Sequence, residues 1–273
     1  MTPVACPTAP FLGSRLRALD VTLGETLARV SDATDDEAIH DLRVAIRRLR
    51  VLLKLARRIF GRYHTDAVRS AFTVVHRSTG ALRDEEVLEE TLARVQVDLP
   101  PFLGWRKKRV SHQKKLRKAV LVELGGTTLK NARALLAALL TFPANPDDEV
   151  DVARFAVRAV ERAQKEVQAR RAVNTDDAAG LHALRIAHKH VRYAAELLSD
   201  ALPAELSALA KPSTLFQKRL GEIHDIDMAI ETLKATRLAA STRVVVIEAL
   251  HGMRAERVAK YLDDATRSYA PGV

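Results

Sequence analysis

Apolar side chains recur along the chain with a helical repeat. Leu42, Ile46, Leu49 and Leu53 follow one another at intervals of three or four residues, which places them on one face of an α-helix. No long stretch alternates apolar and polar residues, and the run VVVI at 244–247 is short and flanked by helix formers. The pattern therefore predicts an all-α protein.

Helix-breaking residues divide this pattern into segments of about 16 to 38 residues, lengths that suit antiparallel helical bundles. The predicted breaks lie at 32–36, 100–101, 125–126, 143–146 and 174–177, around 203 and near 241. The stretch PANPDD at 143–148 is the predicted boundary between two halves, 12–142 and 143–270.

The two halves repeat each other. The matching pairs are IHDLRVAIRRLR at 39–50 with LHALRIAHKHVR at 181–192, GALRDEEVLEETL from Gly80 with GEIHDIDMAIETL from Gly221, and GWRKKRV from Gly104 with GMRAERV from Gly252. Three matches in the same order indicate the duplication of a four-helix unit, and hence a fold with a pseudo-twofold axis.

The polar face of each helix in the first pair is cationic. The first helix carries His40, Arg43, Arg47, Arg50, Lys54 and Arg57 in one stripe, and the second carries His182, Arg185, Lys189 and Arg192. Like charges one helical turn apart repel by a few tenths of a kcal/mol, so solvated helix faces usually interleave acids with bases. The repeated rows with almost no acids favour an external anion over a merely solvated face.

A third basic segment, WRKKRVSHQKKLRK at 105–118, has eight Lys or Arg, one His and no acid. Its apolar residues and the preceding Phe102 predict a docked helix instead of a detached basic tail. The further candidate anion contacts are Lys107, Lys108, Arg109, Lys114, Lys115, Lys118, Lys218 and Arg219.

Composition narrows the partner. Lys plus Arg number 44 against 34 Asp plus Glu, a net charge of +10, which points to nucleic acid, anionic lipid or polymeric phosphate. Aromatic residues are 4% of the chain, too few for the stacking platforms that hold single-stranded nucleic acids.

Cys6 is the only cysteine, which excludes an intramolecular disulfide. No membrane span or signal peptide is recognised, so we expect a cytoplasmic protein.

Catalytic and metal-binding motifs are missing from the sequence, which has no P-loop, no Gly-rich dinucleotide turn and no Gly-x-Ser-x-Gly elbow. His182, His188 and His190 diverge on a helical wheel and cannot converge on one ion. We therefore expect no cofactor, no metal and no catalysis. Asp84 and Asp225 are predicted either to cap new helices or to orient basic side chains.

The paired His-x-x-Arg-x-x-x-Arg/Lys-x-x-Arg helices, each followed by Gly-x-x-x-Asp, resemble the CHAD family, the conserved histidine alpha-helical domain, over about residues 12 to 270. The resemblance implies two four-helix bundles around a basic central cavity or pore that binds inorganic polyphosphate. The contacts it implies are His40, Arg43, Arg47, Arg50, His182, Arg185, Lys189 and Arg192.

The second repeated element departs from the Arg-Asp-x-Asp pattern of the family, since this chain reads Arg83-Asp84-Glu85-Glu86 and His224-Asp225-Ile226-Asp227. Some family members also carry a triphosphate-tunnel hydrolase domain marked by Glu-x-Glu-x-Lys. That string does not occur here, so the resemblance implies a stand-alone binding module.

Alternatives to polyphosphate binding stay open. One is a nucleic-acid-binding or architectural protein that takes nucleic acid as a non-specific polyanion, and another is a phosphate-cleaving enzyme that uses His40 or His182. Anchoring to cytoplasmic storage granules is compatible with all of them. The segment LLAALLTF at 135–142 is predicted to be core instead of a granule anchor.

Overall fold

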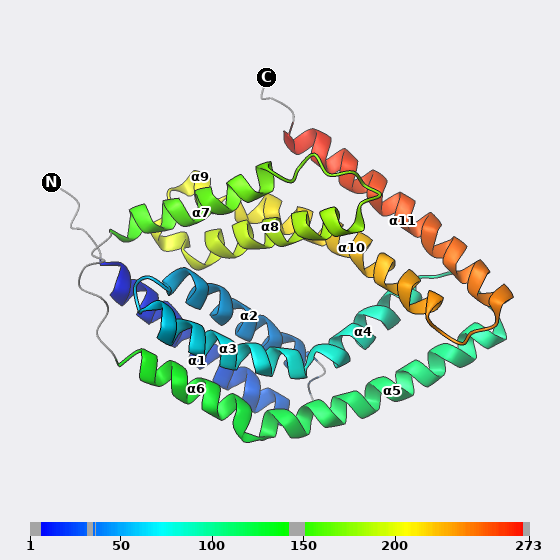
Figure 1. Cartoon of the computed structure of the whole chain (residues 1–273), viewed down its shortest axis with the longest axis horizontal. Coiled ribbons are helices and arrows are strands. Elements are labelled where there is room, and N and C mark those ends of the chain that lie inside the picture. The colour runs from blue at the N-terminus through cyan, green and yellow to red at the C-terminus, as the bar shows by residue number, and fades with distance from the viewer. Residues whose placement is uncertain (1–6, 32–34, 36, 142–150, 270–273) are drawn as a thin grey trace. The chain divides into compact units, whose positions relative to one another are not determined.

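Helices make up the regular structure of the chain. The computed structural model describes residues 7–31, 35, 37–141 and 151–269 (Figure 1). Within these ranges every regular element is helical, apart from an isolated bridge between Pro7 and Asp151. The predicted all-α class is confirmed. The predicted boundary at 142–143, with its PANPDD stretch, lies outside the described residues and stays a prediction.

The helix bounds follow the chain in order. Before the predicted boundary lie α1 (Thr8–Ser31), α2 (Ala38–Ala56), α3 (Arg62–Ser78), α4 (Gly80–Leu92), α5 (Pro100–Gly125) and α6 (Thr127–Leu139). After it lie α7 (Val152–Gln168), α8 (Ala178–Leu197), the 3-10 turn η2 (Ser199–Ala201), α9 (Ala204–Ser207), α10 (Ala210–Lys234) and α11 (Ala240–Tyr269).

Most predicted breaks coincide with helix ends. Helix α5 begins at Pro100, the pair at 125–126 separates α5 from α6, and α11 begins at Ala240. The sequence analysis missed the turn after α2, where Gly61 has a φ of 81°. This left-handed conformation is one that glycine adopts without steric cost.

The helices form two compact units, each assembled from distant parts of the chain. Unit 1 comprises residues 1–83, 116–161 and 193–207, and unit 2 comprises 84–115, 162–192 and 208–273. Helices α4, α5, α7 and α8 each contribute residues to both.

Unit 1 is built on α2, which packs against α1 and α3, while α3 also packs against α6. The predicted apolar face of α2, including Leu42, Ile46 and Leu49, is fully buried. Leu136 and Leu139 of α6 join the same core, as predicted for the segment 135–142, whereas Leu135 is 46% exposed. The apolar face of α2 is anchored, so its cationic face is held in a fixed orientation within the unit.

Unit 2 has two apolar clusters that share α10. One includes Leu92 of α4, Phe102 of α5 and Ile230 of α10, and the other includes Leu184 of α8 and Phe216 of α10. Helix α10 also packs along α11. The apolar face of α8 is thereby buried as predicted, and its polar face is oriented by the same packing.

Ion pairs join the long helices of unit 2 to α4 and α10. Arg106 of α5 bonds Glu89 of α4 through its Nε at 3.2 Å, and Arg254 of α11 bonds Asp227 of α10 at 2.6 Å. Arg106 and Arg254 occupy matching positions in the third repeated motif, GWRKKRV and GMRAERV. That motif therefore has a structural explanation, because its first arginine ties a long helix to its neighbour in both copies.

Candidate anion-binding site

The cationic face of α2 meets further arginines from α3 within unit 1. Burial lowers the pKa of Arg50, and the positive charges of Arg69, Arg77 and Arg47 lower it further. The Nε of Arg50 is buried and has no hydrogen-bond acceptor among the described residues. We call Arg47, Arg50, Arg69 and Arg77 the arginine cluster. It concentrates positive charge around a guanidinium that is partly withdrawn from water.

Two members of this cluster, Arg69 and Arg77, were missed by the sequence analysis. They are eight residues apart on α3, which places them about 80° apart on a helical wheel, on the same side of the helix. That spacing was the available signal. The repeated motifs at 39–50 and 80–92, from which the first candidates came, do not include these two positions.

Arg43 has a different environment from the other arginines of α2. Its side chain is buried, with the residue 7% exposed, and its guanidinium donates hydrogen bonds to Thr79 Oγ1 and, at 3.2 Å, to the carbonyl of His76. These acceptors lie at the C-terminal end of α3, where carbonyls lack helical partners. The structure thus places this predicted phosphate contact at a helix end.

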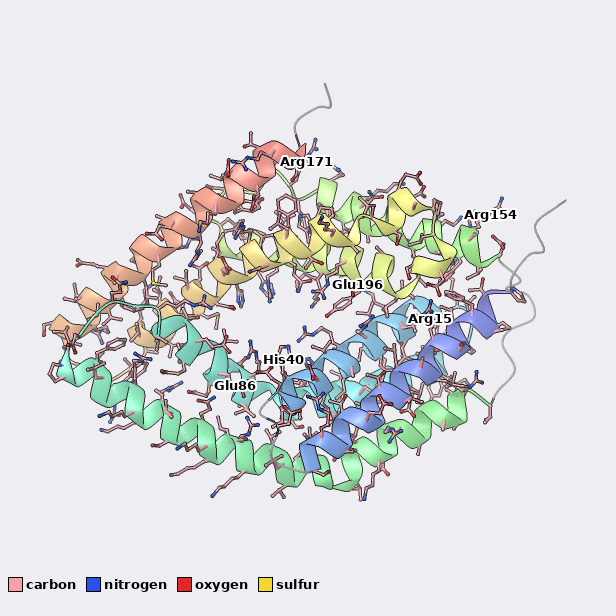
Figure 2. The ribbon with its side chains drawn as sticks, turned by 180° about the vertical axis from the view of Figure 1, so that it is seen from behind. Arg15, His40, Glu86, Arg154, Arg171 and Glu196 are labelled. Atoms are coloured by element: carbon pink, nitrogen blue, oxygen red, sulfur yellow. The ribbon has the colours of Figure 1, made fainter. Side chains whose placement is uncertain are left out.

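The remaining candidates of α2 lie toward its ends. His40 is partly exposed in the first turn (Figure 2), and Lys54 is exposed in the last. Arg57, directly after the helix, pairs with Asp66, whose other carboxylate oxygen lies 3.5 Å from Arg69 Nε. One acid therefore partly neutralises this end of the cationic face.

A second cationic group lies on α8 and α10 within unit 2. The imidazole rings of His182 and His224 have centroids 4.7 Å apart. Burial lowers the pKa of His182, and the charges of His224, Arg185 and Lys189 lower it further. The Nδ1 of His182 is buried without a hydrogen-bond partner in the described part of the chain. We call His182, Arg185, Lys189 and His224 the histidine cluster.

Arg185 approaches α10 closely at Gly221. A Cβ atom at Gly221 would lie 3.3 Å from Arg185 Nε, so any larger residue there would displace the guanidinium. The matching Gly80 of α4 has open space around its Cα. Close approach therefore explains the repeated glycine in the second copy, and nothing in the structure explains it in the first.

The prediction that Asp84 and Asp225 cap new helices is wrong. Helix α4 begins four residues before Asp84, at Gly80, and α10 runs without interruption from Ala210 to Lys234. Both aspartates therefore lie inside helices, where an N-cap role is not available. Asp225 Oδ1 lies 3.4 Å from His224 Nδ1, which agrees with the alternative that it orients a basic side chain. Asp84 is exposed on α4.

A family model places these clusters in a known domain. The CHAD domain model matches residues 16–234, a range that contains α2, α8 and most of both units. The chain belongs to the CHAD domain family. The predicted resemblance is confirmed. No curated protein matches the sequence.

Two solved structures share the fold of this CHAD domain. One is the CHAD domain from the plant Ricinus communis, with a TM-score of 0.75 and 22% identity, covering 98% of this chain and 93% of that one. The other is PptA from Streptomyces chartreusis, with a TM-score of 0.72 and 18% identity, covering 97% of this chain and all of that one. None of the described helices is long and apolar enough to cross a membrane.

The other predicted contacts of the CHAD domain fall into exposed lysines and paired arginines. Lys107, Lys108, Lys114, Lys115, Lys118 and Lys218 are exposed. Arg109 pairs with Glu85, and its guanidinium lies 5.5 Å from the centre of the Trp105 ring. Arg219 bonds Asp264 at 2.6 Å, which raises the pKa of Arg219. Arg192 is partly exposed on α8.

His188 gives this CHAD domain a predictable pH dependence of stability. The residue is 4% exposed and stacks on Phe216, and burial lowers its pKa to about 4. Between pH 6.5 and pH 4 the His188 imidazole is protonated in the unfolded chain and neutral in the folded chain. The free energy of unfolding therefore falls as the pH drops from 6.5 toward 4. The shift corresponds to about 3 kcal/mol.

Between pH 7 and pH 4, the free energy of unfolding measured in urea should fall by about 3 kcal/mol less in His188→Leu than in the wild type. Replacement of the exposed His112 by leucine is the control. Equal pH dependence in wild type and His188→Leu would contradict the assignment.

Proposed function

We propose that this CHAD domain binds inorganic polyphosphate through the cationic faces of α2 and α8, without cleaving it. The observation that carries the proposal is Arg50, a partly buried guanidinium on which the neighbouring cations Arg69, Arg77 and Arg47 act. Repulsion among these like charges lowers the stability of the folded chain unless an anion binds to the arginine cluster.

Polyphosphate has the chemistry that this site requires. It carries negative charge at every unit and presents no base edges, so its affinity comes from many charge-assisted contacts. The planar fork of arginine suits two-point contact with phosphate oxygens. The low aromatic content of the chain is no handicap to binding a polymer without bases.

The sequence repeat supports a finer form of the proposal. In this form the duplicated sequence halves, 12–142 and 143–270, are two four-helix bundles related by pseudo-twofold symmetry, and the repeated helices line a basic central pore. The contacts would include His40, Arg47, Arg50 and Lys54 from the first copy and His182, Arg185, Lys189 and Arg192 from the second. A cytoplasmic protein of this kind could associate with polyphosphate granules.

The environment of the histidines favours the binding of polyphosphate over its cleavage. His182 faces Arg185, Lys189 and His224, cations that depress proton affinity and attract phosphate. An enzyme that cleaves phosphate remains the alternative. Incubation of long chains with the protein and Mg²⁺ should leave their length unchanged.

The proposal is tested by titrating the purified protein with long-chain polyphosphate and, separately, with duplex DNA at about 50 and 200 mM salt, where counterion release is diagnostic. We expect tight polyphosphate binding that persists at the higher salt, and weaker DNA binding that falls steeply. Equal affinities with equal salt dependence would instead indicate a generic basic surface.

A further inference from the structure

Helix α5 sorts its two kinds of basic side chain onto opposite faces. Arg106 and Arg109 turn inward and pair with Glu89 and Glu85 of α4. Lys107, Lys108, Lys114 and Lys115 are all exposed, and at 100° per residue they fall within an arc of about 120° over about 12 Å of helix. We call these four residues the lysine face.

The charges of the lysine face have no acidic partner among the described residues. None of the four ammonium groups has a carboxylate within 4.0 Å in the part of the chain that the structure describes. An exposed lysine elsewhere behaves differently, since Lys234 lies 2.8 Å from Glu231 on the same helix. Glu85 and Glu89 of α4 are engaged by Arg109 and Arg106 of α5. The lysine face is therefore a one-sign surface.

The apolar side of α5 is already occupied. Phe102 is fully buried, and Val120 and Leu124 are 4% and 2% exposed. Between the lysines lie Ser111 and His112, both exposed, and no aromatic or leucine side chain faces outward with them. Insertion into a lipid surface requires an apolar helix face. Val122, at 78% exposure, is one strongly exposed apolar side chain of α5 and does not make such a face. A membrane is thus a poor partner for this surface.

The shape of the surface favours a stiff polyanion. A single helix face is convex and touches only one side of a polymer. A flexible phosphate chain loses conformational freedom when it is fixed on such a surface. Duplex nucleic acid, with a persistence length of about 150 base pairs, presents a pre-arranged row of phosphates and releases condensed counterions on contact. Lysine, a strongly hydrated point charge, suits such solvent-exposed contacts.

We propose that the lysine face of α5 is a docking surface for the phosphate backbone of duplex nucleic acid, independent of base sequence and separate from the polyphosphate site on α2 and α8. These lysines are among the anion contacts predicted from the sequence for the polyphosphate site. Their exposure, convex placement and separation from the paired arginines support the different ligand.

The test compares two quadruple variants of equal net charge. The first replaces Lys107, Lys108, Lys114 and Lys115 with glutamine. The matched control replaces four exposed lysines on other helices, Lys130, Lys165, Lys211 and Lys260, in the same way. Binding of a 30-base-pair duplex and of long-chain polyphosphate is measured by fluorescence anisotropy between about 50 and 200 mM salt.

We expect the lysine-face variant to bind duplex about 30-fold more weakly, with a log–log salt slope shallower by about 3, and to bind polyphosphate as the wild type does. The control should bind both polymers nearly as the wild type does. Equal losses of duplex affinity in both variants would overturn the proposal, because the effect would then be net charge. Loss of polyphosphate affinity with duplex affinity retained would overturn it as well, and would return the lysines to the polyphosphate site. Failure of polyphosphate to bind wild type at all would refute the proposed function and leave the duplex comparison intact.

Discussion

Replacement of Arg50, Arg69 and Arg77 by alanine is expected to weaken polyphosphate binding about 100-fold while the folded domain stays at least as stable as the wild type. The affinity falls because each guanidinium that contacts phosphate contributes about 1 kcal/mol or more. Stability holds because these arginines act on one another as like charges, as the lowered pKa of Arg50 indicates. Their removal relieves repulsion that the free protein carries.

Affinity and stability must be measured on the same preparations to separate these effects. Polyphosphate affinity is obtained by isothermal titration calorimetry and unfolding by urea titration followed by circular dichroism. The matched control replaces Arg154, Arg158 and Arg162 of α7, which are exposed, with alanine and removes the same net charge. A fall in stability without a fall in affinity would mean that the arginine cluster is structural.

Arg43→Ala is expected to lower the free energy of unfolding by about 3 kcal/mol. The substitution empties a buried site and deprives the end of α3 of hydrogen bonds to the His76 carbonyl and the Thr79 hydroxyl. The buried Thr79 hydroxyl then loses its charged donor, while the His76 carbonyl keeps a hydrogen bond from Thr79 Oγ1 at 2.9 Å. The effect should appear as a lower urea midpoint with an unchanged slope.

Arg47→Ala provides the comparison for Arg43, because Arg47 lies one turn further along α2 and is only partly buried. It should leave the free energy of unfolding within about 0.5 kcal/mol of the wild type. An Arg43→Ala protein with normal stability and reduced polyphosphate affinity would restore Arg43 to the binding site predicted from the sequence.

The sequence predicted which helix faces are buried better than it predicted the contacts of individual polar side chains. Leu42, Ile46 and Leu49 are buried as their spacing predicts, since burial of an apolar helix face depends on periodicity. Arg43 and Arg47 are both arginines on the same face of α2. Arg43 is buried and Arg47 is not, because only Arg43 lies against the C-terminal end of α3. That position is set by tertiary packing, which local periodicity does not encode.

The misassigned caps have a similar cause. Asp84 and Asp225 follow glycines, and a glycine normally indicates a break in a helix. In α10 the glycine instead lies within the helix and makes room for Arg185. The interaction that explains Gly221 involves a residue 36 positions earlier on another helix, so no reading of neighbouring residues could have found it.

The two clusters differ in the permanence of their charge. The arginine cluster of unit 1 is cationic at every physiological pH, whereas the histidine cluster of unit 2 contains His182, whose pKa burial and neighbouring cations lower. A phosphate chain bound beside His182 would raise its proton affinity again, so binding there would withdraw protons from solution. In a polyphosphate complex, the arginine cluster would thus hold its ligand with fixed charge, and the histidine cluster would gain part of its charge by taking up protons on binding.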